Sequence, residues 1–120
     1  MLKIGTYKRM NRIVICTDEF LRYLEKHRIE DEHIRTLENE LLLNPQKGDL
    51  IVGTGGVRKI RLAKAGSGKR SGFRVLYIDI PRFELIYLLL IYSKSSQDNL
   101  TEDQKRFLKK LSENIGQELK

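Results

Sequence analysis

The chain has 120 residues, of which 40% are hydrophobic and 32% are charged, and its formal net charge is +7. This length fits one domain with its own core, and the composition is that of a soluble globular protein, neither disordered nor fibrous. The longest apolar run, residues 85–92, is too short to cross a membrane, and residues 1–12 hold no apolar run typical of a secretory signal. The single cysteine, Cys16, excludes an internal disulfide and a thiolate-based metal site. The sequence therefore predicts a cytoplasmic protein without a membrane segment.

The first half of the chain predicts one strand, two helices and a short edge strand. Residues 12–16 are rich in β-branched side chains and predict the first strand. Thr17 or Asp18 can cap a helix that follows it. A second helix is expected over residues 31–43, where apolar residues recur at helical spacing before a proline, and residues 50–53 predict an edge strand. The side chains expected on the inner face of the first helix are Phe20, Leu21, Leu24 and His27.

The second half predicts an antiparallel meander and a closing helix. Residues 57–63 alternate in polarity, and residues 73–80 form the expected next strand. Residues 84–92 are apolar on both faces, as expected of a central strand that is covered on each side. Thr101 and Gln104 form a capping box for the last helix. The predicted fold class is α+β, with a small antiparallel or mixed sheet, two N-terminal helices and a C-terminal helix.

The positive charge is concentrated in the middle of the chain. Residues 1–43 and residues 95–120 are each neutral overall, so residues 44–94 carry the whole excess of +7. Residues 57–74 contain no acid, and six of the nine glycines fall between positions 53 and 72. A glycine-rich segment with one sign of charge lets a phosphate approach the backbone, so the pattern favours an anion site over a solvated loop. The cations of residues 57–74 are Arg58, Lys59, Arg61, Lys64, Lys69, Arg70 and Arg74.

A hairpin around residues 64–72 would bring three of these cations to one face of the sheet. Pairing about the midpoint of the loop places Lys59 near Arg74 and Arg61 near Gly72, and it leaves an apolar opposite face. Like charges on neighbouring strands repel by about 0.2–1 kcal/mol per pair, and a bound anion would offset this cost. We therefore predict that Lys59, Arg61 and Arg74 form a phosphate site.

Other kinds of site have less support in the sequence. The two histidines lie outside the basic segment and the carboxylates within it are scattered, so we expect no metal and no cofactor. Residues 66–70 lack the Ser or Thr of a phosphate-binding P-loop, and residues 53–56 lack the third glycine of a dinucleotide fingerprint. The helix expected over residues 31–43 carries mainly acidic side chains, so we do not expect it to bind DNA as a recognition helix.

Cations with tyrosines nearby are typical of surfaces that hold RNA, where Arg and Lys bind phosphates and aromatic rings stack on unpaired bases. Such a surface can also cut RNA by aligning a 2′-hydroxyl with the neighbouring phosphate, stabilising the charge on phosphorus and moving protons. Tyr92 and Lys94 project to the same side at the end of the last expected strand, and either can serve as acid or base if its pKa is lowered. Tyr77 is a candidate for base contact, although a buried core tyrosine is the more frequent case.

Three segments, taken together, form a more specific pattern than any one of them. They are residues 53–61 (GTGGVRKIR), residues 68–77 (GKRSGFRVLY) and residues 87–94 (YLLLIYSK). In these segments the chain resembles the RelE/HigB toxins of bacterial type II toxin–antitoxin systems, and the HigB branch most closely. The resemblance covers residues 12–112. It implies a single toxin domain over residues 12–120, preceded by an N-terminal extension of residues 1–11.

The resemblance also implies a fold, an activity and partners. The fold would be the RelE-like form of the microbial-ribonuclease α+β fold. The activity would be that of an endoribonuclease that cleaves messenger RNA in the ribosomal A site by 2′-hydroxyl attack, without a metal. A cognate antitoxin, usually a helix-turn-helix protein in this branch, would neutralise the toxin.

Site residues follow from the resemblance by position. Lys59 and Arg61 match the paired cations of the central strand, Arg74 matches the arginine after the loop, and Lys94 lies in the segment of the C-terminal catalytic group. That segment holds serines where several relatives have a histidine or a later tyrosine, so Tyr92 is predicted as acid or base without a family counterpart. A non-catalytic RNA-binding module and a protein that docks an acidic partner remain alternatives. The expected catalytic residues are Lys59, Arg61, Arg74, Tyr92 and Lys94, and the expected RNA-binding residues are Arg58, Lys64, Lys69, Arg70 and Tyr77.

Overall fold

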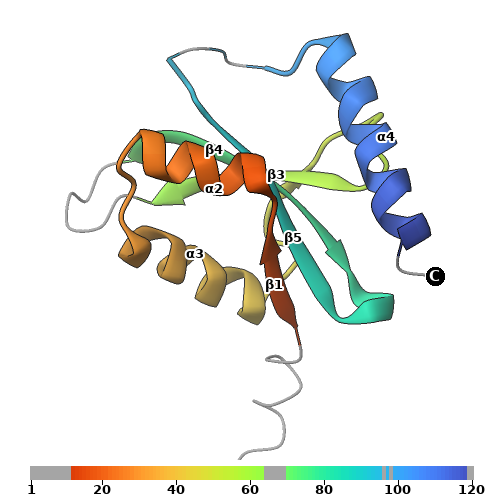
Figure 1. Ribbon diagram of the computed structural model, residues 1–120, viewed down its shortest axis with the longest axis horizontal. Helices are drawn as coiled ribbons and strands as arrows, with labels where there is room; N and C mark the ends of the chain where they lie inside the picture. Colours follow the sequence, from red (N-terminus) through yellow and green to blue (C-terminus); the bar gives the residue numbers. More distant parts are fainter. Residues whose placement is uncertain (1–11, 64–69, 96, 98, 119–120) are drawn as a thin grey trace, which may run out of the picture.

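The computed structural model describes residues 12–63, 70–95, 97 and 99–118. In this part of the chain, five strands form one sheet in the order β1-β5-β4-β3-β2, with α2 and α3 on one side and α4 on the other (Figure 1). This arrangement confirms the predicted α+β class with two N-terminal helices and a C-terminal helix. The elements are β1 (Ile13–Cys16), α2 (Asp18–Lys26), α3 (Asp31–Leu43), β2 (Asp49–Leu50), β3 (Val57–Ala63), β4 (Arg70–Ile80), η1 (Pro81–Phe83), β5 (Leu85–Ser93) and α4 (Glu102–Glu118).

The sheet is mixed because β1 runs parallel to β5, whereas the pairs β5–β4, β4–β3 and β3–β2 are antiparallel. β5 is an interior strand, flanked by β1 and β4, as its apolar sequence predicted, and the central position belongs to β4. The 3₁₀ turn η1 joins β4 to β5, and Pro81 fits its first position because no N–H is needed there. Arg12 donates a hydrogen bond to Asp79 at 2.9 Å, and this ion pair raises the pKa of the Arg12 guanidinium. No helix of the described residues is long and apolar enough to span a membrane.

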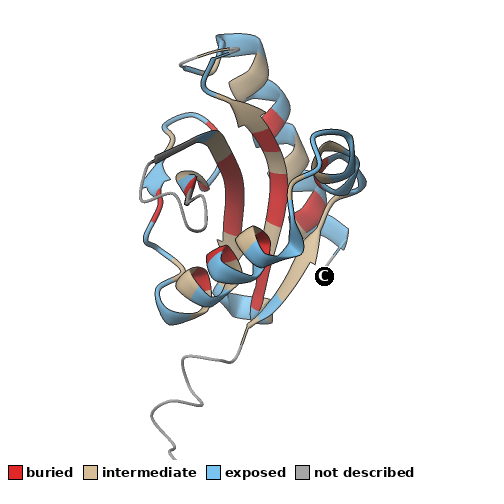
Figure 2. Cartoon of the chain, turned by 90° about the vertical axis from the view of Figure 1, so that its left-hand side faces the viewer, coloured by how far each residue is buried: buried red, intermediate tan, exposed pale blue. Residues whose placement is uncertain are grey.

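One apolar cluster fills the space between the sheet and the helices α2 and α3. The Thr17 side chain caps α2 by accepting a hydrogen bond from the Phe20 N–H at 3.1 Å, and it donates to the Leu89 carbonyl at 2.6 Å. The cap therefore ties the start of α2 to β5. Fully buried members of this cluster are Phe20, Leu41, Val75, Tyr77, Ile86 and Leu88. Figure 2 shows the buried residues along the central strands and on the sides of the helices that face them.

The inner face of α2 differs from the prediction in two residues. Phe20 is buried and Leu24 packs partly against the same cluster, as expected. Leu21 is 49% exposed. Successive residues of a helix are rotated by about 100°, so Leu21 lies outside the stripe of side chains that Phe20 and Leu24 share. His27 is also exposed.

A second apolar cluster lies under α4, on the other face of the sheet. It contains Val57, Leu76, Ile78, Leu89, Leu108 and Ile115. The predicted capping box is present, because the Gln104 N–H donates to Thr101 Oγ1 at 3.1 Å and the Thr101 N–H donates to Gln104 Oε1 at 2.9 Å. This box fixes where α4 begins, and so which part of the sheet it covers.

The glycines before β3 form a tight turn beneath α4. Gly55 has φ +78°, and a Cβ at this position would lie 2.6 Å from the Oγ of Ser112 in α4. Ser112 Oγ also donates to the Thr54 carbonyl at 3.2 Å. Turn geometry and helix packing therefore account for these glycines without a phosphate. The same turn shortens the edge strand predicted over residues 50–53 to Asp49–Leu50.

Candidate functional site

Three polar side chains form a row across the strands β3, β4 and β5. Arg61 pairs with Arg74, and Arg74 pairs with Tyr92. Residues that face each other across a ladder point to the same side of the sheet, with Cβ atoms about 5 Å apart. The row therefore projects from the face that carries α4. Lys59, two residues before Arg61 in β3, lies on this face as well.

The register of the hairpin differs from the prediction by two residues. Arg61, and not Lys59, faces Arg74, and Lys59 faces Leu76. A β-bulge between Arg61 and Ala63 displaces the pairing from the midpoint of the loop, and the sequence shows no sign of this bulge. Because the shift is an even number of residues, the same side chains still share a face, and the three cations lie together as predicted.

The three cations of this face project from strands that the sheet holds in place. Arg61 is exposed, and Lys59 and Arg74 are partly exposed. The ion pairs found among the described residues include none of the three. The contact that orients Arg74 is a bond from its Nη1 to the Phe73 carbonyl at 3.4 Å. Two facing guanidinium groups thus keep their positive charge available to an anion from solvent.

The opposite face of the same hairpin corrects one predicted RNA contact, that of Tyr77, and shows what Arg58 binds within the fold. Tyr77 is fully buried, and its hydroxyl donates to the Pro45 carbonyl at 2.7 Å and accepts from the Gly48 N–H at 2.9 Å. Burial raises the pKa of Tyr77. Arg58, which pairs with Tyr77, donates to the carbonyls of Gly48 at 2.8 Å and Gln46 at 3.2 Å. Tyr77 therefore cannot stack on a base, and Arg58 holds the loop before β2.

The alternation of side chains between the two faces of β4 already indicates, in the sequence, that Tyr77 points toward the core. Tyr77 has the same parity as Val75, which belongs to the buried cluster, and the opposite parity to Arg74. Side chains of opposite parity project from opposite faces, so Tyr77 falls on the apolar face of the predicted hairpin and Arg74 on its cationic face.

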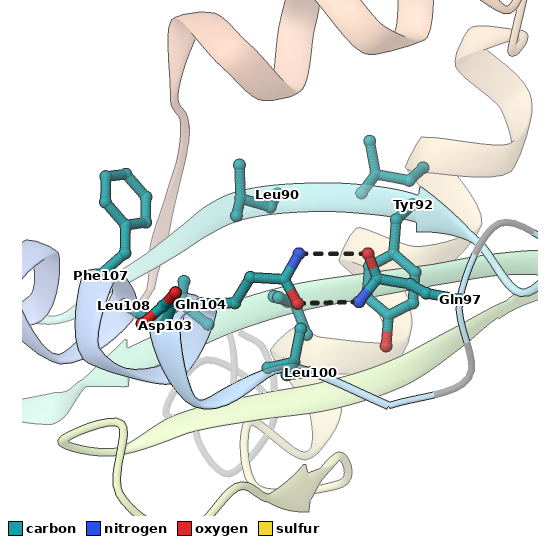
Figure 3. Close-up of a pocket in the computed structure, with 10 residues that line it drawn as sticks. Leu90, Tyr92, Gln97, Leu100, Asp103, Gln104, Phe107 and Leu108 are labelled. Atoms are coloured by element: carbon teal, nitrogen blue, oxygen red, sulfur yellow. Dashed lines mark hydrogen bonds between the residues drawn. The ribbon is translucent and has the colours of Figure 1, made fainter.

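Tyr92 borders a cavity of about 270 Å³ between the end of β5 and the start of α4. At the mouth of this cavity, Gln97 and Gln104 exchange two amide hydrogen bonds of 2.9 and 3.2 Å beside the Tyr92 ring (Figure 3). The Tyr92 hydroxyl oxygen is buried in this arrangement. The wall of the cavity is mainly apolar and includes Leu76, Leu90, Leu100, Phe107 and Leu108.

Lys94 follows β5 and is exposed. The Lys94 backbone N–H donates to the Gly72 carbonyl. Lys94 therefore lies beside Gly72, which precedes Arg74 by two residues in β4. Of the other predicted RNA contacts, Lys64 and Lys69 lie outside the described residues, and only the backbone of Arg70 is described. Within the described ranges, no group of three His, Cys, Asp or Glu side chains is placed to hold a metal ion.

An aromatic group that the sequence analysis did not identify lies at the same end of β4. The rings of Tyr23 and His27 stack at 4.0 Å, and Phe73 meets both edge-on, at 6.0 and 6.3 Å. Burial raises the pKa of Tyr23. The spacing of Tyr23 and His27, four residues apart in a helix, indicates that they are neighbours. The sequence offers no comparable signal for Phe73, which reaches them through the tertiary fold.

Two solved structures and one family model are similar to this chain. The structure of Escherichia coli toxin RelE in the free state, carrying two arginine-to-alanine substitutions, aligns with a TM-score of 0.52 at 14% identity and covers 72% of this chain and 87% of that chain. An archaeal RelE–RelB complex from Pyrococcus horikoshii aligns with a TM-score of 0.48 at 22% identity, over 73% of this chain and 100% of that chain. The family model for the RelE toxin of the RelE/RelB toxin–antitoxin system matches residues 12–119. With that match over nearly its whole length, and with the fold that it shares with the Escherichia coli toxin, the chain belongs to the RelE toxin family.

Proposed function

We propose that this protein is an endoribonuclease that cuts messenger RNA in the A site of a translating ribosome, without a metal. In the reaction, the 2′-hydroxyl of one nucleotide attacks the adjacent phosphate, the bond to the 5′-oxygen breaks, and the 5′-oxygen takes up a proton. The observation that carries the proposal is the pairing of Arg61 with Arg74 on an open sheet face, together with membership of the RelE toxin family.

The paired guanidinium groups suit the charge that develops in this reaction. Attack on phosphorus concentrates negative charge on the non-bridging oxygens, and two guanidinium groups on adjacent strands can each donate to one of them. Lys59, on the same face of β3, adds a third positive charge. Because the backbone hydrogen bonds of the sheet hold β3 and β4, little reorganisation is required when the charge appears.

Two residues are candidates for proton transfer. Tyr92 faces Arg74 across the ladder, so its side chain lies on the same face of the sheet as the paired arginines. The Tyr92 hydroxyl is buried here, so its use requires the side chain to turn out of the cavity under α4. Lys94 is already exposed and lies beside the start of β4. Comparing Tyr92→Phe with Lys94→Ala separates the two, because loss of the proton-transfer group lowers cleavage about 10²–10⁴-fold.

We further propose that the partner of this toxin is a helix-turn-helix antitoxin, as in the HigB branch, and that the toxin acts in the cytoplasm as one domain of residues 12–120. The family model describes a toxin of a toxin–antitoxin system, which supports an antitoxin partner. An acidic segment of the antitoxin that covers Arg61 and Arg74 would block the phosphate site directly.

The test is to add purified protein to ribosomes programmed with a defined messenger RNA and to map the new RNA ends. Wild-type protein is expected to produce new ends, and Arg74→Ala is expected to lower their yield at least 100-fold. Arg82→Ala is the matched control, because Arg82 is an exposed arginine in the turn at the opposite end of β4. A 2′,3′-cyclic phosphate on the upstream fragment supports 2′-hydroxyl attack, and a 3′-hydroxyl there contradicts it. Binding of RNA without new ends favours a non-catalytic RNA-binding module.

A further inference from the structure

The rings of Tyr23, His27 and Phe73 form a small aromatic platform at the end of α2. Tyr23 and His27 are stacked nearly parallel, with centroids 4.0 Å apart and an interplanar angle of 24°. Phe73 supports both rings from the side, with interplanar angles of 86° and 66°. Tyr23 and Phe73 pack partly against the core cluster under α2 and α3, so they fix the platform from below.

His27 is the outward-facing member of the platform. It is exposed, whereas Tyr23 and Phe73 are partly buried. One side of its ring is covered by Tyr23, so solvent reaches the ring mainly from the other side. Core packing explains Tyr23 and Phe73 but does not require an aromatic residue at an exposed position. A flat, preoriented and exposed ring is what stacking on a planar ligand requires.

The residues around His27 are mixed in charge, with two cations directly beside it and the exposed acids Glu25 and Glu30 further along the chain on either side. Lys26 and Arg28 flank it in sequence and are exposed, and the ion pairs of the described ranges include neither of them. Lys26 lies in the last turn of α2, and Arg28 follows that helix with φ 53°. A ligand with a planar group for the ring and a negative charge for these two adjacent cations fits this surface. A nucleotide has both properties.

The platform also lies next to the proposed phosphate site. Phe73, whose ring centroid is 6.3 Å from that of His27, is the residue before Arg74. The Arg74 guanidinium bonds to the Phe73 carbonyl, although the two side chains project from opposite faces of β4. The His27 ring and the Arg74 guanidinium therefore lie near the same end of β4 but on opposite sides of the sheet. An RNA that contacts both passes around the edge of the sheet, and the stacked base and the bound phosphate belong to different nucleotides.

We propose that the exposed face of His27 stacks on an unpaired base of the RNA whose backbone phosphate lies on Arg61 and Arg74. The inference rests on the proposed function and adds a second contact to it, on the opposite face of the sheet. Tyr23 and Phe73 are positioning residues, because they hold the His27 ring in place. Stacking of this kind tolerates any base, so the platform contributes affinity and alignment, and it does not select a sequence.

Short RNAs that contain 2-aminopurine test the proposal, because the fluorescence of this base falls when it stacks. Each RNA carries one 2-aminopurine at a different position and 2′-O-methyl groups, which prevent attack by the 2′-hydroxyl. A parallel set carries an abasic site in place of the fluorescent base. Binding to wild-type protein is expected to quench the fluorescence at one position. His27→Ala is expected to abolish most of this quenching and to weaken binding about tenfold.

Three matched variants make the outcome decisive. His27→Phe is expected to restore quenching and affinity, because it keeps a flat ring. His33→Ala, on α3, is expected to behave as wild type. Arg74→Ala is expected to weaken binding of the abasic RNA as much as that of the intact RNA, whereas His27→Ala is expected to leave the abasic RNA unaffected.

Two results would overturn the stacking site. One is wild-type quenching in His27→Ala, and the other is an equal loss of affinity for intact and abasic RNA, which would make the contribution of His27 purely electrostatic. The proposed function fails separately, if wild-type protein stacks on the base but produces no new ends on programmed ribosomes. Normal cleavage together with unchanged stacking in His27→Ala would overturn the stacking site alone.

Discussion

The two faces of the sheet are made from the same strands, but they are covered differently. The face under α2 and α3 is closed along β3 and β4, with Leu62, Val75 and Tyr77 all buried. The face under α4 is apolar at one end and cationic at the other. Along β3 this change occurs within one face, from the fully buried Val57 to the exposed Arg61.

This difference separates stability from function within one small sheet. Facing arginines cost stability when no anion is bound, and the closed apolar face offsets that cost. α4 packs on the apolar end of this face, where Leu108 and Ile115 share a buried cluster with Leu76 and Ile78. We therefore expect a substitution on β3 or β4 to affect RNA cleavage if the side chain lies at the cationic end of the α4 face. We expect it to affect folding if the side chain lies on the face under α2 and α3.

The largest expected effect is on cleavage, from Arg61→Ala. Removing one of two donors that stabilise charge in the transition state lowers the cleavage rate about 10²–10³-fold. The melting temperature should stay equal or rise slightly, because the repulsion between Arg61 and Arg74 costs about 0.2–1 kcal/mol. Cleavage on programmed ribosomes and thermal unfolding measure the two effects. A large fall in melting temperature would show that Arg61 is a structural residue and would contradict the separation.

Tyr77→Phe should produce the opposite result, a loss of stability with cleavage retained in the folded fraction. The substitution leaves the buried Gly48 N–H and the Pro45 carbonyl without their partner, at a cost of about 2 kcal/mol in the free energy of unfolding. Denaturant unfolding at neutral pH measures this cost. Unchanged stability together with lost RNA binding would restore the predicted contact between Tyr77 and RNA.

Alkaline pH gives a second measurement on Tyr77. Burial raises the pKa of its hydroxyl above the ordinary value of 10.0, so the contribution of the protonated group is complete below about pH 10. That contribution is lost as pH rises through the raised pKa, because the ionised group cannot donate to the Pro45 carbonyl. Wild-type protein should therefore lose stability above pH 10 more steeply than Tyr77→Phe does. Parallel slopes would contradict the role assigned to this hydroxyl.

Gly55→Ala tests the contact between α4 and the turn before β3. A non-glycine residue at φ +78° is strained, and its Cβ would meet Ser112 Oγ at 2.6 Å, so we expect a loss of about 1–2 kcal/mol. Ser112→Ala removes the clashing hydroxyl but not the backbone strain, so Gly55→Ala should cost less in a Ser112→Ala background than in the wild-type chain. Denaturant unfolding of the two single variants and the double variant measures this coupling. Equal costs in the two backgrounds would show that α4 does not press on the turn.

The sequence predicted the faces of the hairpin but not its register. Alternation along residues 57–63 depends only on the strand period, so it correctly placed Lys59 and Arg61 on one side. Register depends on how the loop closes, and the bulge after Arg61 cannot be read from a glycine-rich loop that permits several closures. For this reason the direct partner of Arg74 was predicted to be Lys59, whereas it is Arg61.

The same limit applies to the other parts of the site. Helix ends were predictable where a local signal exists, as for the Thr17 cap and the capping box of Thr101 and Gln104. The aromatic platform was not, because Phe73 and His27 meet only after α2 has docked on the sheet. Local patterns thus determined which elements form, and tertiary packing determined which side chains meet.

The smallest expected effect, and the closest control for Arg61, comes from Arg58→Ala. Arg58 lies three residues before Arg61 in β3 and projects from the opposite face, where it donates to the Gly48 and Gln46 carbonyls. Because this guanidinium is partly exposed, its loss should cost only about 1 kcal/mol in the free energy of unfolding. Cleavage should stay within about twofold of wild type, because the paired arginines keep their positions. Equal losses of cleavage in Arg58→Ala and Arg61→Ala would mean that total positive charge, and not its position on one face, drives the reaction.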